Sequence, residues 1–135
     1  MKMVRAFSLV LFLVSLSVFA AEPVRLGGDV VPLGESVTLT ADPRGDDYSG
    51  SVVVELQVKK ATSSFRFHAE DLTLTSMRLG AIDVTHAKGE DATVIVTAAT
   101  PLQPGKYTLA IDFTGKYNRQ AVGLYKMTTK DGAPY

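Results

Sequence analysis

A strict two-residue alternation between Tyr107 and Phe113 most strongly limits what this chain can fold into. Four large apolar side chains alternate there with small or polar ones. Successive side chains of a β-strand point to opposite faces, so the pattern predicts a strand with one buried and one exposed face. Pro104 and Gly105 give a turn signal at its start, and Gly115 is expected to end it.

The chain after residue 21 reads as further short strands separated by turns. Residues 51–59 repeat the alternation, and a change of phase between Leu74 and Met77 predicts a β-bulge near Thr75 and Ser76. No stretch of ten residues has a helical period. The other predicted strands cover 37–40, 64–68, 82–84, 92–98 and 122–128, with a hairpin turn at 88–91. These patterns predict one all-β unit, either an antiparallel sandwich or an open curved sheet.

The first twenty residues form a segment of a different kind. Lys2 and Arg5 give a positive start, an almost uninterrupted apolar run follows, and Val18 and Ala20 offer the small residues that a signal peptidase reads. We therefore expect a secretory signal peptide over 1–20, a mature chain over 21–135, and export to the periplasm or the exterior. The run is shorter than the ~20 residues of a membrane span, and an uncleaved signal anchor is the alternative.

Charge and cysteine content exclude several partners and cofactors. Residues 21–135 carry 12 basic and 14 acidic side chains, a net charge of −2, without a basic patch. Nucleic acid is therefore not an expected partner, and no membrane contact is expected beyond the signal segment. The chain has no cysteine, so it forms no disulfide and offers no thiolate to a metal.

The two histidines, His68 and His86, do not have the spacing of a catalytic zinc site. Such a site needs His-Glu-x-x-His on a helix, with two imidazoles one turn apart and a glutamate as base. That spacing occurs nowhere in the sequence. By alternation His68 shares the polar face of its predicted strand with Arg66, as is typical of a solvated side chain. We expect no metal ligand in this chain.

Acidic and serine residues also lack a catalytic arrangement. Carboxylates gather at 42–47, 70–71 and 90–91, beside turn residues or strand ends, where they are usually solvated. The first group only loosely approaches a calcium loop, and a turn explains its Arg-Gly-Asp triplet without an adhesion role. No Gly-x-Ser-x-Gly elbow and no phosphate-binding glycine loop are present. We expect no catalytic and no cofactor-binding residue.

Several motifs, in the right order, resemble the N-terminal β-domain of the aminopeptidase N family of zinc metallopeptidases. Residues 102–115 are similar to the family's Leu-x-x-Gly-x-Tyr-x-Leu-x-Ile-x-Phe-x-Gly strand, and Gly123-Leu124-Tyr125 is similar to its Gly-Phe-Tyr triplet. Residues 65–72 resemble Ile-x-Leu-His-Ala-x-Asp-Leu. Residues 25–33, 37–40 and 48–52 resemble the family's opening and first two strands, with Gly27 and Glu35 replacing a proline and a tyrosine.

The resemblance implies a saddle-like, non-catalytic domain of an exported enzyme that removes N-terminal residues from peptides. Such a domain packs against a thermolysin-like catalytic domain and walls the substrate entrance. Zinc, its ligands, the Gly-x-Met-Glu-Asn motif and the glutamate base belong to that later domain. The family's Gln or Glu for the substrate α-amine follows the Gly-Phe-Tyr triplet and would fall beyond Tyr135. The resemblance also implies that 21–135 is a partial domain, because family members continue with further strands.

A free-standing exported β-sandwich that binds a protein or glycan is the alternative interpretation. The ordered motifs favour the aminopeptidase interpretation, because a generic binding module has no reason to contain them. The two also differ in behaviour: a free-standing module should be soluble and monomeric alone, whereas a severed domain should need its partner. We expect the isolated segment to expose apolar strand edges and to associate or fold poorly.

Overall fold

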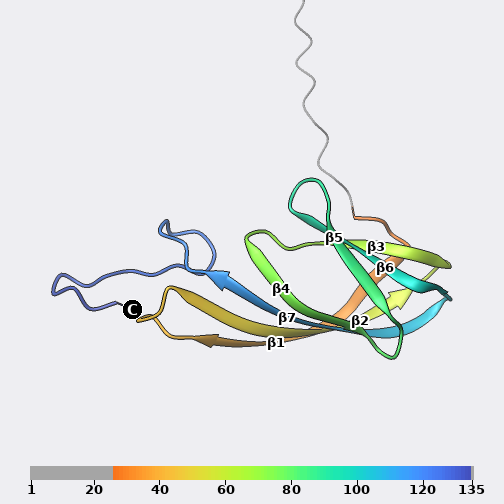
Figure 1. The fold of residues 1–135 in the computed structure, drawn as a ribbon, viewed down its shortest axis with the longest axis horizontal. Coiled ribbons are helices and arrows are strands. Elements are labelled where there is room, and N and C mark those ends of the chain that lie inside the picture. The colour runs from red at the N-terminus through yellow and green to blue at the C-terminus, as the bar shows by residue number, and fades with distance from the viewer. Residues whose placement is uncertain (1–25, 135) are drawn as a thin grey trace, which may run out of the picture.

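The computed structural model describes residues 26–134, which contain seven β-strands and no α-helix (Figure 1). The strands form two antiparallel sheets, one in the order β1-β2-β7-β4 and one in the order β3-β6-β5. Their bounds are β1 (Val30–Ala41), β2 (Asp47–Val58), β3 (Thr62–His68), β4 (Leu72–Leu79), β5 (Val84–Lys88), β6 (Thr93–Leu102) and β7 (Gly105–Lys116). The predicted all-β antiparallel fold is confirmed. The predicted signal peptide, residues 1–20, lies outside the described residues.

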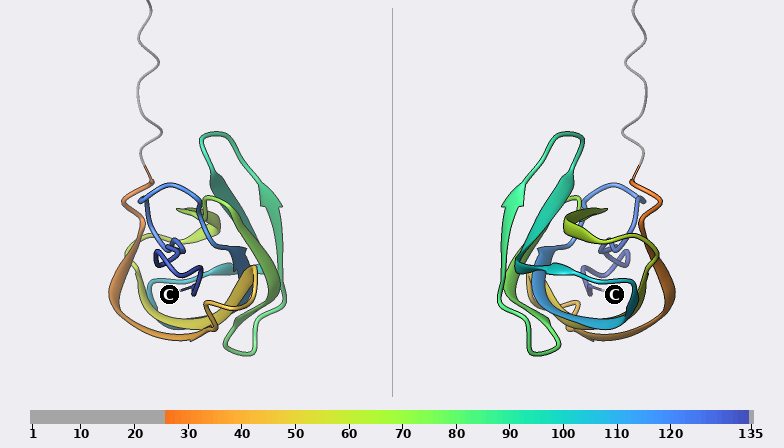
Figure 2. Two further views of the ribbon diagram at one scale, coloured as in Figure 1. Left: turned by 90° about the vertical axis from the view of Figure 1, so that its left-hand side faces the viewer. Right: turned by 90° about the vertical axis from the view of Figure 1, so that its right-hand side faces the viewer.

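The four-stranded sheet is built around β2 and β7, which pair along their full lengths. Strands β1 and β4 form its two edges. In β4 the register shifts between Leu74 and Ser76, where the change of phase predicts a bulge. Figure 2 shows that this sheet is strongly curved, and Figure 1 shows the three-stranded sheet set against one end of it. Between residues 26 and 134 no helix has the length and apolar character needed to cross a membrane.

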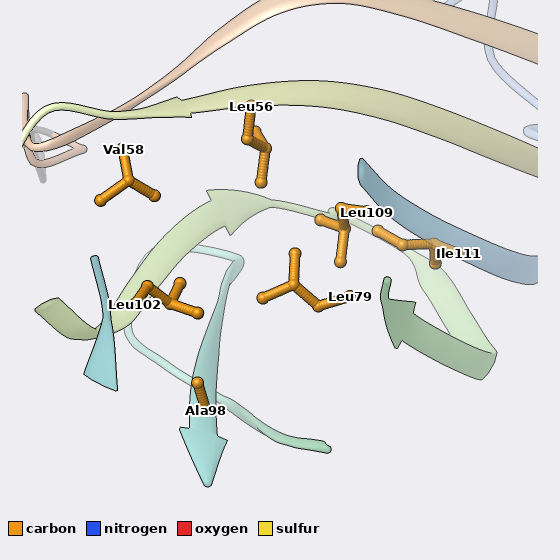
Figure 3. Packing of buried hydrophobic residues seen from close by; sticks show 7 residues of the cluster. All are labelled: Leu56, Val58, Leu79, Ala98, Leu102, Leu109 and Ile111. Atoms are coloured by element: carbon orange, nitrogen blue, oxygen red, sulfur yellow. The ribbon is translucent and has the colours of Figure 1, made fainter. Parts of the chain in front are cut away.

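The hydrophobic core lies between the two sheets. The four-stranded sheet contributes residues from β2, β4 and β7, and the other sheet contributes residues from β6 (Figure 3). Val58 and Leu79 have no exposed surface, and Leu102 is 1% exposed. The central cluster consists of Leu56, Val58, Leu79, Ala98, Leu102, Leu109 and Ile111. Alternation therefore identified the buried faces of β2 and β7 correctly.

The first strand is longer than predicted. A strand was expected over 37–40, whereas β1 begins at Val30. Pro32 and Gly34 weaken the strand signal in its first half, and the register of β1 against β2 shifts between these two residues. Because β1 is an edge strand, it can tolerate a residue without an N–H group and a local bulge.

The strand predicted at 82–84 has the wrong bounds. Gly80 has a φ of +56°, and the N–H of Ile82 donates to the carbonyl of Leu79 at 2.9 Å. The chain therefore turns sharply here, and β5 begins only at Val84. The predicted turn between this strand and the next is confirmed, because β5 and β6 form an antiparallel hairpin.

The strand predicted at 122–128 is wrong. Residues 117–134 form bends, turns and isolated bridges, such as the bridge between Asn118 and Tyr125. Gly123 has a φ of +64°, a left-handed conformation that interrupts an extended strand. The N–H of Asn118 also donates to the carbonyl of Leu124, so the segment closes on itself. We call residues 117–134 the C-terminal segment.

Candidate functional site

The best-defined cluster of polar and aromatic groups lies where β2 begins and β7 ends. Tyr48 of β2 pairs with Gly115 of β7, and the tyrosine ring covers this glycine. A Cβ atom on Gly115 would lie 2.9 Å from Cε1 of Tyr48 and closer still to other atoms of the ring, so only glycine allows this approach. Tyr117 follows β7 and packs against Tyr48 with ring centroids 5.4 Å apart at 55°. This tilted arrangement is favourable for two aromatic rings.

Lys126 attaches the C-terminal segment to this cluster. Its ammonium group donates to the carbonyl of Gly45 at 2.5 Å and to Oδ1 of Asp46 at 3.1 Å. The same nitrogen lies 5.5 Å from the centroid of the Tyr117 ring. The hydrogen bond from Lys126 lowers the pKa of the Asp46 carboxyl. Tyr48, Tyr117, Lys126, Gly45 and Asp46 are called the tyrosine–lysine cluster below.

Within this cluster, the ion pair is the weakest of the three contacts that Lys126 makes. The Asp46 side chain is 96% exposed, whereas that of Lys126 is only 27% exposed. A pair with one fully solvated partner contributes little, because water screens it. The carbonyl of Gly45 and the face of Tyr117 are the partners that compensate the half-buried ammonium group.

A hollow of about 830 Å³ lies beside the tyrosine–lysine cluster. Its wall carries both acidic and basic side chains, among them Asp71 and Arg119. The hydroxyl of Tyr117 is buried and is the one buried side-chain polar atom in 26–134 that has no hydrogen-bond partner. The residues that line the hollow therefore combine charges of both signs with Tyr117.

The two histidines are not brought together. His68 ends β3 opposite Thr93, and His86 lies on β5 opposite Val96, so strand β6 separates them. Both side chains are exposed, and His86 lines a second hollow of about 660 Å³. In the described part of the chain, no group of three or more His, Cys, Asp or Glu residues could hold a metal ion.

The acidic turn at 42–47 contains an ion pair between Asp42 and Arg44. Asp42 accepts hydrogen bonds from Nε of Arg44 at 2.9 Å and from Nη2 at 2.7 Å. Gly45 closes the turn through its N–H, which donates to the carbonyl of Asp42 at 3.0 Å. These hydrogen bonds lower the pKa of Asp42 from its usual 3.8 to about 2. The arginine thus binds both carboxylate oxygens of Asp42.

A comparison with known protein families identifies the family to which this chain belongs. Residues 31–135 match the family model described as the Peptidase M1 N-terminal domain. The chain belongs to this family. The resemblance to aminopeptidase N enzymes is thereby confirmed. The family is zinc-dependent in its catalytic domain, and M1 N-terminal domains generally pair with the catalytic domain of the same enzyme.

The residues of this M1 N-terminal domain do not fit a zinc site of their own. His68 and His86 lie on different strands with β6 between them, and no third ligand joins either within 26–134. The two imidazoles therefore do not form part of one ligand set in the described part of the chain.

Sequence reasoning missed the tyrosine–lysine cluster in this M1 domain. Tyr48 and Tyr117 are far apart in sequence, and Lys126 fell within the strand wrongly predicted at 122–128. One signal could have pointed to the cluster: a glycine on the apolar face of a predicted strand, Gly115, leaves room for an aromatic ring from the neighbouring strand.

Proposed function

We propose that this chain is the non-catalytic N-terminal domain of an exported zinc aminopeptidase. It docks on the catalytic domain of that enzyme and forms part of the wall of the substrate entrance. The observation that carries the proposal is the match of residues 31–135 to the Peptidase M1 N-terminal domain. Peptides are the substrates, and the catalytic domain supplies the zinc and all catalytic residues.

An exposed apolar surface supports the docking role. On β1, Val37 is 53% exposed and Leu39 is 51% exposed, although both lie on the face of the sheet that is buried further along. The C-terminal segment adds a second group of exposed apolar side chains, which consists of Val122, Leu124, Tyr125 and Met127. Exposed apolar side chains that gather in this way are typical of surfaces that bind another protein.

The positions of these two groups suggest how the domain reaches the substrate entrance. The second half of β1 and the C-terminal segment, which carry these groups, lie away from the three-stranded sheet, which is set against the other end of the curved four-stranded sheet (Figure 1). Docking through this open end would leave the three-stranded sheet facing outward. The hollow beside Tyr117 would then lie close to the boundary between the two domains, where a peptide could pass.

The proposal is tested by reading the native transcript past the codon for Tyr135. An in-frame continuation that encodes His-Glu-x-x-His and a downstream glutamate ligand is the expected result. A stop codon at this point, together with a stable and monomeric secreted product, would contradict the proposal. That outcome would favour the free-standing binding module instead.

A further inference from the structure

We propose that Lys126 is a positioning residue that fastens the C-terminal segment to the turn between β1 and β2. Through this contact it sets the path along which the chain leaves the four-stranded sheet. The inference rests on the proposed function, because the C-terminal segment lines the hollow that is proposed to lie beside the substrate entrance. The inference goes beyond the proposed function because it names one side chain, that of Lys126, as the group that orients the C-terminal segment.

The C-terminal segment is held mainly by hydrogen bonds within itself. Many of its backbone hydrogen bonds are internal: the N–H of Asn118 donates to Leu124, and the N–H of Lys126 donates back to Asn118. These bonds shape a compact loop without attaching it to a sheet. Figure 1 shows this loop beyond the end of β7 and close to the β1–β2 turn. Its orientation therefore depends on contacts with that turn.

Two hydrogen bonds join the C-terminal segment to the turn between β1 and β2. The N–H of Tyr117 donates to the carbonyl of Asp46 at 3.2 Å, at the base of the loop. Nine residues further on, the ammonium group of Lys126 donates to the carbonyl of Gly45. This second contact joins residues 81 apart in sequence, and it attaches the loop to the turn at a point well away from its base.

A lysine is well suited to position 126 because of the groups that surround its ammonium group. The ammonium group is half-buried between a carbonyl oxygen and the face of Tyr117. A charged donor forms a stronger hydrogen bond than a neutral one, and an aromatic face attracts a cation more strongly when water is partly excluded. Tyr48 holds the Tyr117 ring in place, and Gly115 lets Tyr48 approach.

The test uses the 135-residue chain and hydrogen–deuterium exchange of its backbone amides. In Lys126→Met, which keeps the length of the side chain but removes the charge and the donors, we expect exchange in 118–134 to accelerate roughly tenfold or more. Exchange in β7 should stay unchanged. Lys126→Arg keeps the charge and should restore most of the protection. Asp46→Asn is the matched control and should have little effect, because that carboxylate is fully exposed.

A second pair of variants separates the ring of Tyr117 from its hydroxyl. The hydroxyl has no partner among the described residues, so Tyr117→Phe should leave the protection of the segment intact. Tyr117→Leu keeps an apolar side chain but removes the aromatic face, and should accelerate exchange as Lys126→Met does. The chain contains five tyrosines and no tryptophan, so the difference in near-ultraviolet circular dichroism between Tyr117→Phe and Tyr117→Leu reports on the aromatic pair of Tyr48 with residue 117.

Three results would overturn the inference. Unchanged exchange in Lys126→Met would show that the segment is held without the lysine. Equal acceleration in β7 and in the segment would show that Lys126 supports the whole fold rather than the path of the chain. Failure of Lys126→Arg to restore protection would show that the positive charge is not what matters. No catalytic domain is present in this experiment, so its outcome is independent of whether the proposed docking is correct.

Discussion

Strands β7 and β1 have the same alternating pattern, yet they differ sharply in burial. On β7, Leu109 is 3% exposed and Ile111 is 4% exposed. On β1, Val37 and Leu39 are about half exposed although they belong to the same face of the sheet. A single cross-strand row shows the change, because Val37 pairs with Val52, which pairs with Ile111.

The difference teaches that alternation identifies the apolar face of a strand but not what covers it. The three-stranded sheet packs over the part of the face around β7 and supplies Ala98 and Leu102 to the core. It reaches Val30 at the start of β1 but leaves Val37 and Leu39 in the second half of that strand about half exposed. An apolar row that continues past the edge of its cover is expected where a domain packs against a partner.

The largest expected effect comes from shortening the same side chain in both regions. Leu109→Ala in β7 shortens a side chain that is only 3% exposed and should lower the free energy of unfolding by about 2–5 kcal/mol. Leu39→Ala at the open edge should lower it by about 1 kcal/mol or less. Denaturant unfolding of both variants measures the difference. Equal losses would show that the edge is packed as tightly as the centre.

A smaller effect is expected when a methyl group is added at the boundary between the two regions. A Cβ atom on Gly50 would lie 2.6 Å from Cζ of Phe113 and 2.8 Å from the backbone oxygen of Thr38. Because backbone cannot move aside easily, Gly50→Ala should cost about 1–3 kcal/mol. Gly34→Ala is the matched control in β1, since its Cβ would meet nothing within 4 Å. Thermal unfolding should separate them, and similar melting temperatures would contradict this account.

The open edge should also affect self-association more than stability. Within β1, the two features that protect an edge strand are a proline and a bulge, and both lie in its first half, at Pro32 and Gly34. We expect the purified chain to associate at high concentration, and Val37→Lys should reduce this association while changing stability by ~0.5 kcal/mol or less. Thr38→Lys places the same charge on the opposite face as a control. Sedimentation velocity that shows a wild-type monomer at all concentrations would refute this prediction.

The smallest effect concerns the exposed turn at the end of the edge strand. The hydrogen bonds from Arg44 lower the pKa of Asp42 to about 2. A carboxyl whose pKa is lowered on folding adds stability above its usual pKa of 3.8, and this contribution disappears as the pH falls toward 2. Both side chains are exposed, so the pKa itself is the suitable measurement. A carbon-detected NMR titration should give about 2, and Arg44→Gln should return it toward 3.8.

The sequence predicts those parts of the fold whose cause is local. Alternation in β2 and β7 identifies the core face, and the change of phase between Leu74 and Met77 identifies the bulge in β4. The strand predicted at 122–128 is wrong because Gly123 has a left-handed backbone conformation, which interrupts an extended strand. That conformation belongs to a loop closed by its own hydrogen bonds, and a run of apolar residues gives no sign of them.

The tyrosine–lysine cluster shows the limit of sequence reasoning for a site. Each member alone has an ordinary explanation: a strand tyrosine, a strand glycine, a lysine among polar residues. Only the register of β2 against β7 places Tyr48 over Gly115, and only the fold of the C-terminal segment brings Lys126 to Gly45. Long-range pairings of this kind are set by the whole sheet and cannot be read from neighbouring residues.

The most direct test of the central claim is hydrogen–deuterium exchange of the 135-residue chain, alone and mixed with the M1 catalytic domain of the same organism. We predict that exchange slows on mixing in the second half of β1 and in residues 118–127, while the outer three-stranded sheet is unaffected. Val37→Lys should abolish the slowing in β1, and Thr38→Lys should leave it unchanged. Protection confined to the three-stranded sheet, or no protection at saturating concentrations, would contradict the proposal that the open edge docks on a catalytic domain.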